Sequence, residues 1–132
     1  MTDQLTLIAA ISLGAVLGAN ARYFLNLWCA RHLGTEFPWG IFLVNVTGSF
    51  LMGCVAALLA KISLPPQFGV LATVGTLGSF TTFSTYSLDG VRLLERGDWT
   101  RAAAYLGGSA ILGVLAALAG LALISFLVGP ES

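Results

Sequence analysis

The chain has 132 residues, of which 57% are hydrophobic and only 9% are charged, with six basic and six acidic side chains. Soluble domains average about 25% charged residues, so this composition excludes a soluble domain and predicts an integral membrane protein. A transmembrane helix needs about 20 apolar residues, so about four helices form a single all-α transmembrane domain over residues 1–132. The zero net charge gives no indication of a nucleic-acid partner.

The first transmembrane helix is expected over residues 5–29, with Asp3 as a candidate cap. Gly14 and Gly18 are four residues apart, a spacing that lets a partner helix approach closely. Arg22 lies toward the C-terminal end of this helix, and two interpretations stay open. Its side chain either extends to the membrane interface or places a positive charge at the mouth of an anion path.

The second transmembrane helix is expected over residues 39–60, and its strongly polar side chain is Asn45. An asparagine in such a helix either makes a hydrogen bond to another helix or lines a path, and the sequence leaves both open. Cys29 and Cys54 fall in apolar segments, so we expect buried thiols rather than a disulfide.

The third transmembrane helix, expected over residues 68–94, contains an unusual stretch, Gly75–Ser87, rich in hydroxyls, glycines and aromatics and free of charge. An unpaired polar group in hydrocarbon costs several kcal/mol, so this stretch must face protein or water. Its glycines and hydroxyls predict a break in the helix. Backbone carbonyls freed by a break are natural ligands for a hard cation.

Beyond this stretch, Asp89, Arg92 and Glu95 are spaced three apart and are expected to pair along one helical face. The fourth transmembrane helix is expected over residues 100–128. Its polar side chains, Tyr105 and Ser109, lie in its first half.

Nine polar groups collected from the expected membrane helices share one property: they can all donate a hydrogen bond, and none of the nine is a carboxylate, lysine or histidine. They are Asn45, Ser79, Thr81, Thr82, Ser84, Thr85, Tyr86, Tyr105 and Ser109. A catalytic site needs a nucleophile beside a base, so an enzyme is not expected. Donors without acceptor charges suit a small anion, and the ring edges of Phe80 and Phe83 can face one too. The alternative is that this stripe is packing alone.

The run Gly78–Ser87 resembles the signature of the Fluc (CrcB) fluoride channels. The resemblance covers nearly the whole chain, because residues 14–22, 43–48, 94–97 and 102–105 with Ser109 also fit the family's pattern in order and spacing. It implies a fluoride-selective channel that exports fluoride passively, as a multi-pass protein of the inner (plasma) membrane.

The resemblance also implies an architecture and a set of site residues. The fold would have a broken third helix, and the protein would be an antiparallel, dual-topology homodimer with two pores. A central structural Na⁺ would bind the backbone carbonyls of Gly78 and Thr81. The fluoride path would be lined by Asn45, Phe83, Tyr86, Tyr105 and Ser109, with Arg22 in a vestibule and the hydroxyls of Thr82 and Thr85 nearby. Tyr86 stands where the family usually has Phe, which puts the ion contacts at that position in doubt.

Two rivals come from other classes. A small multidrug exporter also has about four short membrane helices, but it needs an acidic residue in the first, where this chain has Arg22. A structural membrane subunit without transport does not account for the polar stripe.

Overall fold

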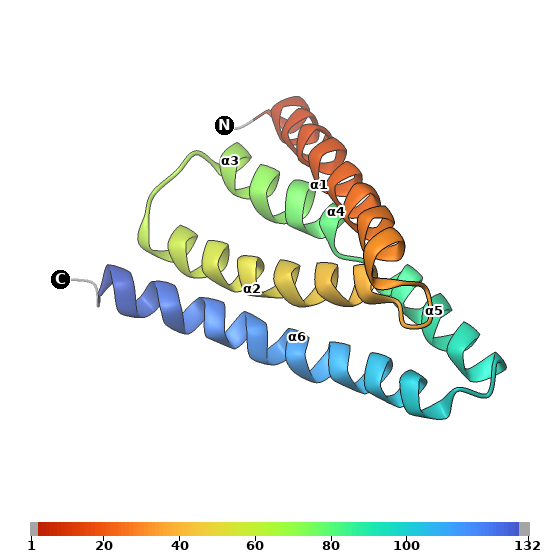
Figure 1. The fold of residues 1–132 in the computed structure, drawn as a ribbon. Coiled ribbons are helices and arrows are strands. Elements are labelled where there is room, and N and C mark those ends of the chain that lie inside the picture. Colours follow the sequence, from red (N-terminus) through yellow and green to blue (C-terminus); the bar gives the residue numbers. More distant parts are fainter. Residues whose placement is uncertain (1–2, 130–132) are drawn as a thin grey trace.

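The computed structural model describes residues 3–129, and it is a bundle of helices (Figure 1). Residues 1–2 and 130–132 of the expected domain lie outside the described part. Three helices are long, and four shorter helical segments follow one another between the second and third of these long helices. The long helices are α1 (Gln4–Leu33), α2 (Trp39–Lys61) and α6 (Trp99–Val128); the short segments are α3 (Pro66–Val70), the π-helix η1 (Leu71–Leu77), α4 (Gly78–Phe80) and α5 (Phe83–Glu95).

The three long helices are long and apolar enough to cross a membrane. They cover the ranges expected for the first, second and fourth transmembrane helices, while the range 68–94 is divided among the short segments. Large apolar side chains point outward along them, with Leu5 71% and Phe126 85% exposed. Extended apolar surface of this kind marks contact with lipid or with another protein.

Local signals fix where the helices begin and end. Asp3 caps α1, because its carboxylate accepts a hydrogen bond from the Leu5 N–H at 3.3 Å. Gly34 ends α1 with a φ of 85°, in the left-handed region that glycine tolerates best. Asp98 caps α6 in the same way as Asp3 caps α1, accepting from the Arg101 N–H at 3.2 Å.

Successive long segments of the chain alternate in direction. In Figure 1, α2 and α6 lie side by side and run parallel, and α1 runs parallel to the α3–α4 segments beside it. Glycines allow the closest approaches. A Cβ added at Gly53 or Gly120 would overlap the backbone of the facing helix, and one added at Gly14 or Gly18 would overlap the backbone of η1. The close partner expected for the Gly14–Gly18 pair is therefore η1 of the same chain.

The segment η1 is wound more loosely than an α-helix. Its backbone has the i→i+5 pattern, and the Thr76 hydroxyl also reaches five residues back, donating to the Leu71 carbonyl at 2.9 Å. At the other end of the bundle, α5 packs on α2 and α6 around buried Ile41, Leu93 and Tyr105. Both cysteines are free thiols, with Cys29 buried and Cys54 half-buried.

Candidate functional site

The helical path is interrupted at two residues, Thr81 and Thr82. Their backbones are extended, with φ and ψ of −80° and 157° at Thr81 and −151° and 122° at Thr82. The α5 helix starts at the next residue, and Thr82 caps it by accepting from the Thr85 N–H at 3.2 Å. The Thr82 hydroxyl also lies 3.2 Å from the Thr85 hydroxyl and 3.3 Å from the Ser84 hydroxyl. The interruption therefore carries a cluster of hydroxyls at the N-terminus of α5.

The Asn45 side chain makes two hydrogen bonds to the Thr82 backbone. Its Oδ1 accepts from the Thr82 N–H at 2.8 Å, and its Nδ2 donates to the Thr82 carbonyl at 3.0 Å. In a continuous helix, the Thr82 N–H would donate to the Gly78 carbonyl. The amide of α2 therefore replaces a helical hydrogen bond, which leaves the Gly78 carbonyl without that donor.

The Arg22 side chain makes a hydrogen bond to the Thr81 backbone. Its Nη1 donates to the Thr81 carbonyl at 3.1 Å, across 59 positions of sequence. The side chain is half-buried. The sequence left open that Arg22 extends to the membrane interface or lies at the mouth of an anion path. Neither interpretation includes the bond to the Thr81 carbonyl, which directs the guanidinium toward the backbone of the interruption.

A row of aromatic rings leads from the interruption toward α6. Phe83 and Tyr86 have ring centroids 5.6 Å apart, and Tyr86 and Tyr105 have centroids 5.4 Å apart. The Tyr86 hydroxyl donates to the Leu106 carbonyl at 2.6 Å, so it points into the α6 backbone. Phe83 is 79% exposed on the surface of the single chain. The row therefore runs from an exposed ring to a fully buried one.

Two buried hydroxyls on α6 have no hydrogen-bond partner among the described residues. They belong to Tyr105, which is 0% exposed, and Ser109, which is 7% exposed. The two are four positions apart, so they share one face of the helix. A buried polar group left unpaired costs about 1–3 kcal/mol, so each hydroxyl favours a further partner. The Asp89 carboxylate lies near the Tyr105 hydroxyl but does not form a hydrogen bond with it.

The candidate residues expected from the sequence thus fall into two groups. Around the interruption, the structure brings together Arg22, Asn45, Gly78, Thr81, Thr82, Phe83 and Thr85. Tyr86 connects this group to the two unpaired hydroxyls of α6 through its contact with Tyr105.

Comparison with known proteins identifies the family of this chain. Residues 9–121 match the family described as CrcB-like protein, Camphor Resistance (CrcB). The chain belongs to the CrcB family. A relative from Nitrobacter winogradskyi, named fluoride-specific ion channel FluC, is 45% identical over 120 residues, which cover 90% of this chain and 95% of the relative. Proteins of the same name from Rhodospirillum centenum and Chloroflexus aurantiacus are 48% identical over 119 residues and 38% identical over 117 residues. These matches cover 89% and 88% of this chain, and 94% and 93% of the relatives.

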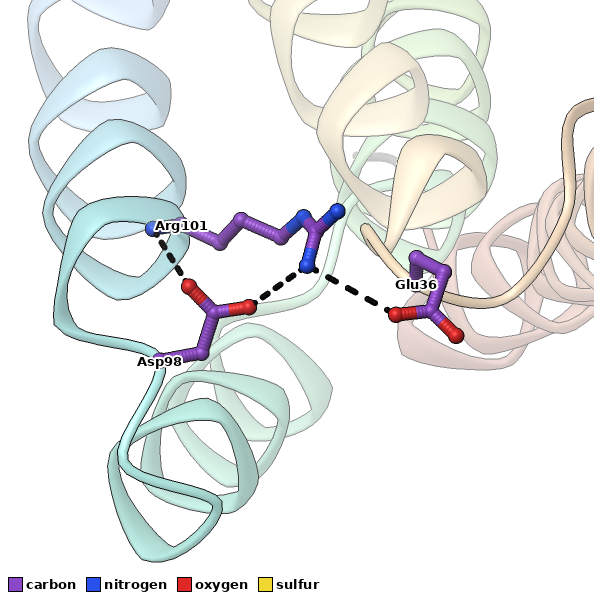
Figure 2. A network of polar contacts seen from close by, with 3 residues as sticks. All are labelled: Glu36, Asp98 and Arg101. Carbon is purple, nitrogen blue, oxygen red and sulfur yellow. Dashed lines mark hydrogen bonds and ion pairs between the residues drawn. The ribbon is translucent and has the colours of Figure 1, made fainter.

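This CrcB family member also carries a polar network that its sequence did not lead us to expect (Figure 2). The Arg101 guanidinium donates to Asp98 Oδ2 at 2.7 Å and lies 3.6 Å from Glu36 Oε2. The network ties the link between α1 and α2 to the start of α6. Arg101 lowers the pKa of the Asp98 carboxyl, chiefly through this hydrogen bond. The Asp98–Arg101 spacing of three was a usable signal for that pair, but Glu36 is remote in sequence.

The same end of this CrcB chain is hollowed by two adjoining surface cavities of about 170 and 190 Å³. Both include Thr35, Pro38 and Asp89 in their walls, and neither includes a residue expected to bind an ion. Asp89 pairs with Arg92 at 3.5 Å, as the spacing predicted. Among residues 3–129, the expected pairing of Arg92 with Glu95 is not formed, and that prediction was wrong.

Proposed function

We propose that this chain is a fluoride-selective channel that lets fluoride leave the cytoplasm passively across the inner (plasma) membrane. The observation that carries the proposal is the pair of buried, unpaired hydroxyls of Tyr105 and Ser109. Both can donate to an anion, and the chain's relatives are named fluoride-specific ion channels. Transport rather than catalysis fits the site, because the groups around the interruption are hydrogen-bond donors, and the nearby Asp89 carboxylate is paired with Arg92.

The path would exchange the water around fluoride for donors supplied by the protein. Asn45 uses one amide hydrogen on the Thr82 carbonyl and keeps a second for the ion. The rings of Phe83 and Tyr86 offer positive edges, and Thr82 and Thr85 contribute hydroxyls at the N-terminus of α5. Because the Tyr86 hydroxyl is engaged by Leu106, that residue acts through its ring as Phe would. Such contacts must be strong enough to admit the ion and weak enough to release it.

The working unit would be an antiparallel, dual-topology homodimer with two pores. Phe83 is 79% exposed in the single chain, which supports a second copy completing the path around it. Gly78 is exposed as well and lies at the same interruption. The chain has only six Lys and Arg residues, so little basic charge is available to fix a single orientation in the membrane.

A structural Na⁺ would be held by backbone carbonyls at the interruption. The Gly78 carbonyl fits this role, because the Thr82 N–H donates to Asn45 instead. The Thr81 carbonyl accepts from Arg22, and its second lone pair remains for a cation. One chain offers two such oxygens, so the site requires the matching pair from a second copy. When bound, the ion would neutralise carbonyls that the interruption leaves exposed.

Flux from proteoliposomes tests the proposal. Purified protein is reconstituted into vesicles loaded in turn with fluoride, with chloride and with a cationic dye. Rapid release of fluoride alone is the expected result. Release of the dye would favour a multidrug exporter, for which α1 lacks the acidic residue. Release of nothing from folded, paired protein would favour a structural subunit and overturn the proposal.

A further inference from the structure

Two side chains from different helices hold opposite sides of one peptide bond. The Thr81 carbonyl accepts from Arg22 of α1 at 3.1 Å, and the Thr82 N–H donates to Asn45 of α2 at 2.8 Å. These are the two polar groups of the peptide that joins Thr81 to Thr82. Because an unpaired peptide group at membrane depth is strongly disfavoured, a non-helical peptide there needs such partners.

Each of these bonds stands in for one that a continuous helix would make. The Thr81 carbonyl would accept from the Thr85 N–H, which instead donates to the Thr82 hydroxyl at 3.2 Å. The Thr82 N–H would donate to the Gly78 carbonyl and instead reaches Asn45. Arg22 and Asn45 thus replace the two helical bonds of the same peptide.

The orientation of this peptide sets the direction in which the α5 helix leaves the interruption. Thr82 is the cap of α5, and Phe83 is the first residue of that helix. A rotation of the peptide plane would move the cap, and with it the ring of Phe83. The contact between Phe83 and Tyr86 then places the aromatic row relative to Tyr105.

We propose that Arg22 and Asn45 are positioning residues that fix the plane of the Thr81–Thr82 peptide. Arg22 acts as the hydrogen-bond donor to the Thr81 carbonyl and not as a free charge that attracts anions. The half-buried guanidinium faces a carbonyl, whereas Arg31, in the exposed last turn of the same helix, has no side-chain hydrogen bond within residues 3–129. The expected effect on fluoride efflux rests on the proposed function, whereas the spectroscopic test of the two hydrogen bonds does not.

The sequence permits a direct measurement on this one peptide. Thr81–Thr82 is the only Thr-Thr pair in the chain. Protein labelled with ¹³C-carbonyl and ¹⁵N threonine therefore gives a single signal in a carbonyl–nitrogen correlation spectrum of the full chain in nanodiscs. That signal reports the Thr81 carbonyl carbon together with the Thr82 N–H.

Arg22→Gln is expected to move the carbonyl frequency to lower values, because a carbonyl carbon is shielded when its oxygen loses a donor. Asn45→Ala is expected to move the Thr82 N–H frequencies instead. The matched control Arg31→Gln removes the same charge from the same helix and should leave the signal in place. An unchanged carbonyl frequency in Arg22→Gln, or an unchanged N–H in Asn45→Ala, would overturn the inference.

Arg22→Lys separates the bond from the charge, because it keeps the charge on a shorter, non-planar donor. Fluoride efflux across wild type, Arg22→Lys and Arg22→Gln is expected to vary with the Thr81 carbonyl frequency. Efflux that depends on the charge instead, with Arg22→Lys fully active despite a shifted carbonyl, would show that Arg22 acts as an attracting charge. If wild-type vesicles released no fluoride, the proposed function would fail while the spectra would still decide the contact.

Discussion

The Asn45 amide binds both polar groups of the Thr82 backbone, accepting from its N–H at 2.8 Å and donating to its carbonyl at 3.0 Å. An amide is the side-chain group that suits this task, because it offers a donor and an acceptor side by side. A residue of α2 thereby becomes part of the backbone hydrogen bonding of a segment 37 positions away.

Replacing that amide with a carboxylate tests its dual role. Asn45→Asp keeps the size of the side chain but has no donor for the Thr82 carbonyl, and it adds a negative charge beside the path of an anion. We expect fluoride efflux to be lost and the unfolding free energy to fall by about 1–3 kcal/mol. Efflux is measured with a fluoride electrode. Gln4→Glu is the control, since it makes the same amide-to-carboxylate change at the exposed first turn of α1; equal efflux from Asn45→Asp and wild type would contradict the assignment.

The exposed ring of Phe83 is expected to matter for flux and not for folding. Phe83→Ile keeps an apolar side chain but removes the positive ring edge that can face an anion. Fluoride efflux should be abolished, while size-exclusion chromatography should give an unchanged elution volume. Phe126, also highly exposed at 85%, serves as the control through Phe126→Ile. Retained efflux in Phe83→Ile would remove this residue from the path.

The unpaired hydroxyls of Tyr105 and Ser109 should behave unlike a paired one. Tyr105→Phe and Ser109→Ala each delete a buried group without a partner, so thermal stability should stay the same or rise while fluoride efflux falls. Tyr86→Phe deletes a hydroxyl bonded to Leu106 at 2.6 Å and should lose about 0.5–1.5 kcal/mol with efflux retained. The reverse pattern, with efflux lost only in Tyr86→Phe, would argue against this division of roles.

Close packing of α1 on η1 should make Gly18 intolerant of a side chain. A methyl group at Gly18 would overlap the Thr76 carbonyl, which belongs to the backbone and cannot rotate away. Gly18→Ala is expected to cost about 1–3 kcal/mol of unfolding free energy. In Gly108→Ala, the nearest atom to the new methyl is on Phe42 at 3.6 Å, an ordinary contact, so stability should not fall. Thermal unfolding in detergent compares the two, and equal melting temperatures would refute the packing argument.

The Arg101 network should make the stability of the link region depend on acid. The pKa of Asp98 is lowered below its usual 3.8 in the folded chain, so its contribution is complete above that value. The contribution is lost as the pH falls through the lowered pKa. Proteolysis of the 34–38 link should therefore accelerate below about pH 4 in wild type. In Asp98→Asn, it should be faster at neutral pH and less dependent on acid; a pH dependence equal to that of wild type would exclude Asp98 as its source.

Composition was a sound guide to the long helices and to the unusual stretch within the third. Long apolar runs leave few alternatives to α1, α2 and α6, and the dense hydroxyls and glycines around Thr81 marked that segment as different. The contacts of Arg22 and Asn45 were beyond reach, because they join residues 59 and 37 positions apart. For Asn45, the sequence left open a hydrogen bond to another helix or a place along a path; for Arg22, it left open the membrane interface or the mouth of a path. Only the packing of α1 and α2 around the interruption identifies Thr81 and Thr82 as their partners.

The π-helix η1 was missed for a different reason. Its sequence, Leu71–Leu77, contains the same small and branched residues as an ordinary membrane helix, so no residue in it indicates the wider turn. The Glu36–Arg101 contact was missed because the sequence does not tell that the link between α1 and α2 lies beside the start of α6. In each case, the missing information was the position of a neighbouring element.

The wider turn of η1 has a consequence for how the chain can change by insertion and deletion. An α-helix advances by about 100° per residue, so one residue more or fewer in an α-helical segment would rotate everything after it by roughly that angle. A π-helical turn closes over one more residue than an α-helical turn, with the i→i+5 pattern in place of i→i+4. If one residue of Leu71–Leu77 were removed, relaxation of the wide turn to an α-helical turn would take up the loss, and the Thr81 carbonyl would keep nearly its present direction toward the Arg22 guanidinium. The loose winding of η1 thus helps to set the angle at which the Thr81–Thr82 interruption faces α1 and α2.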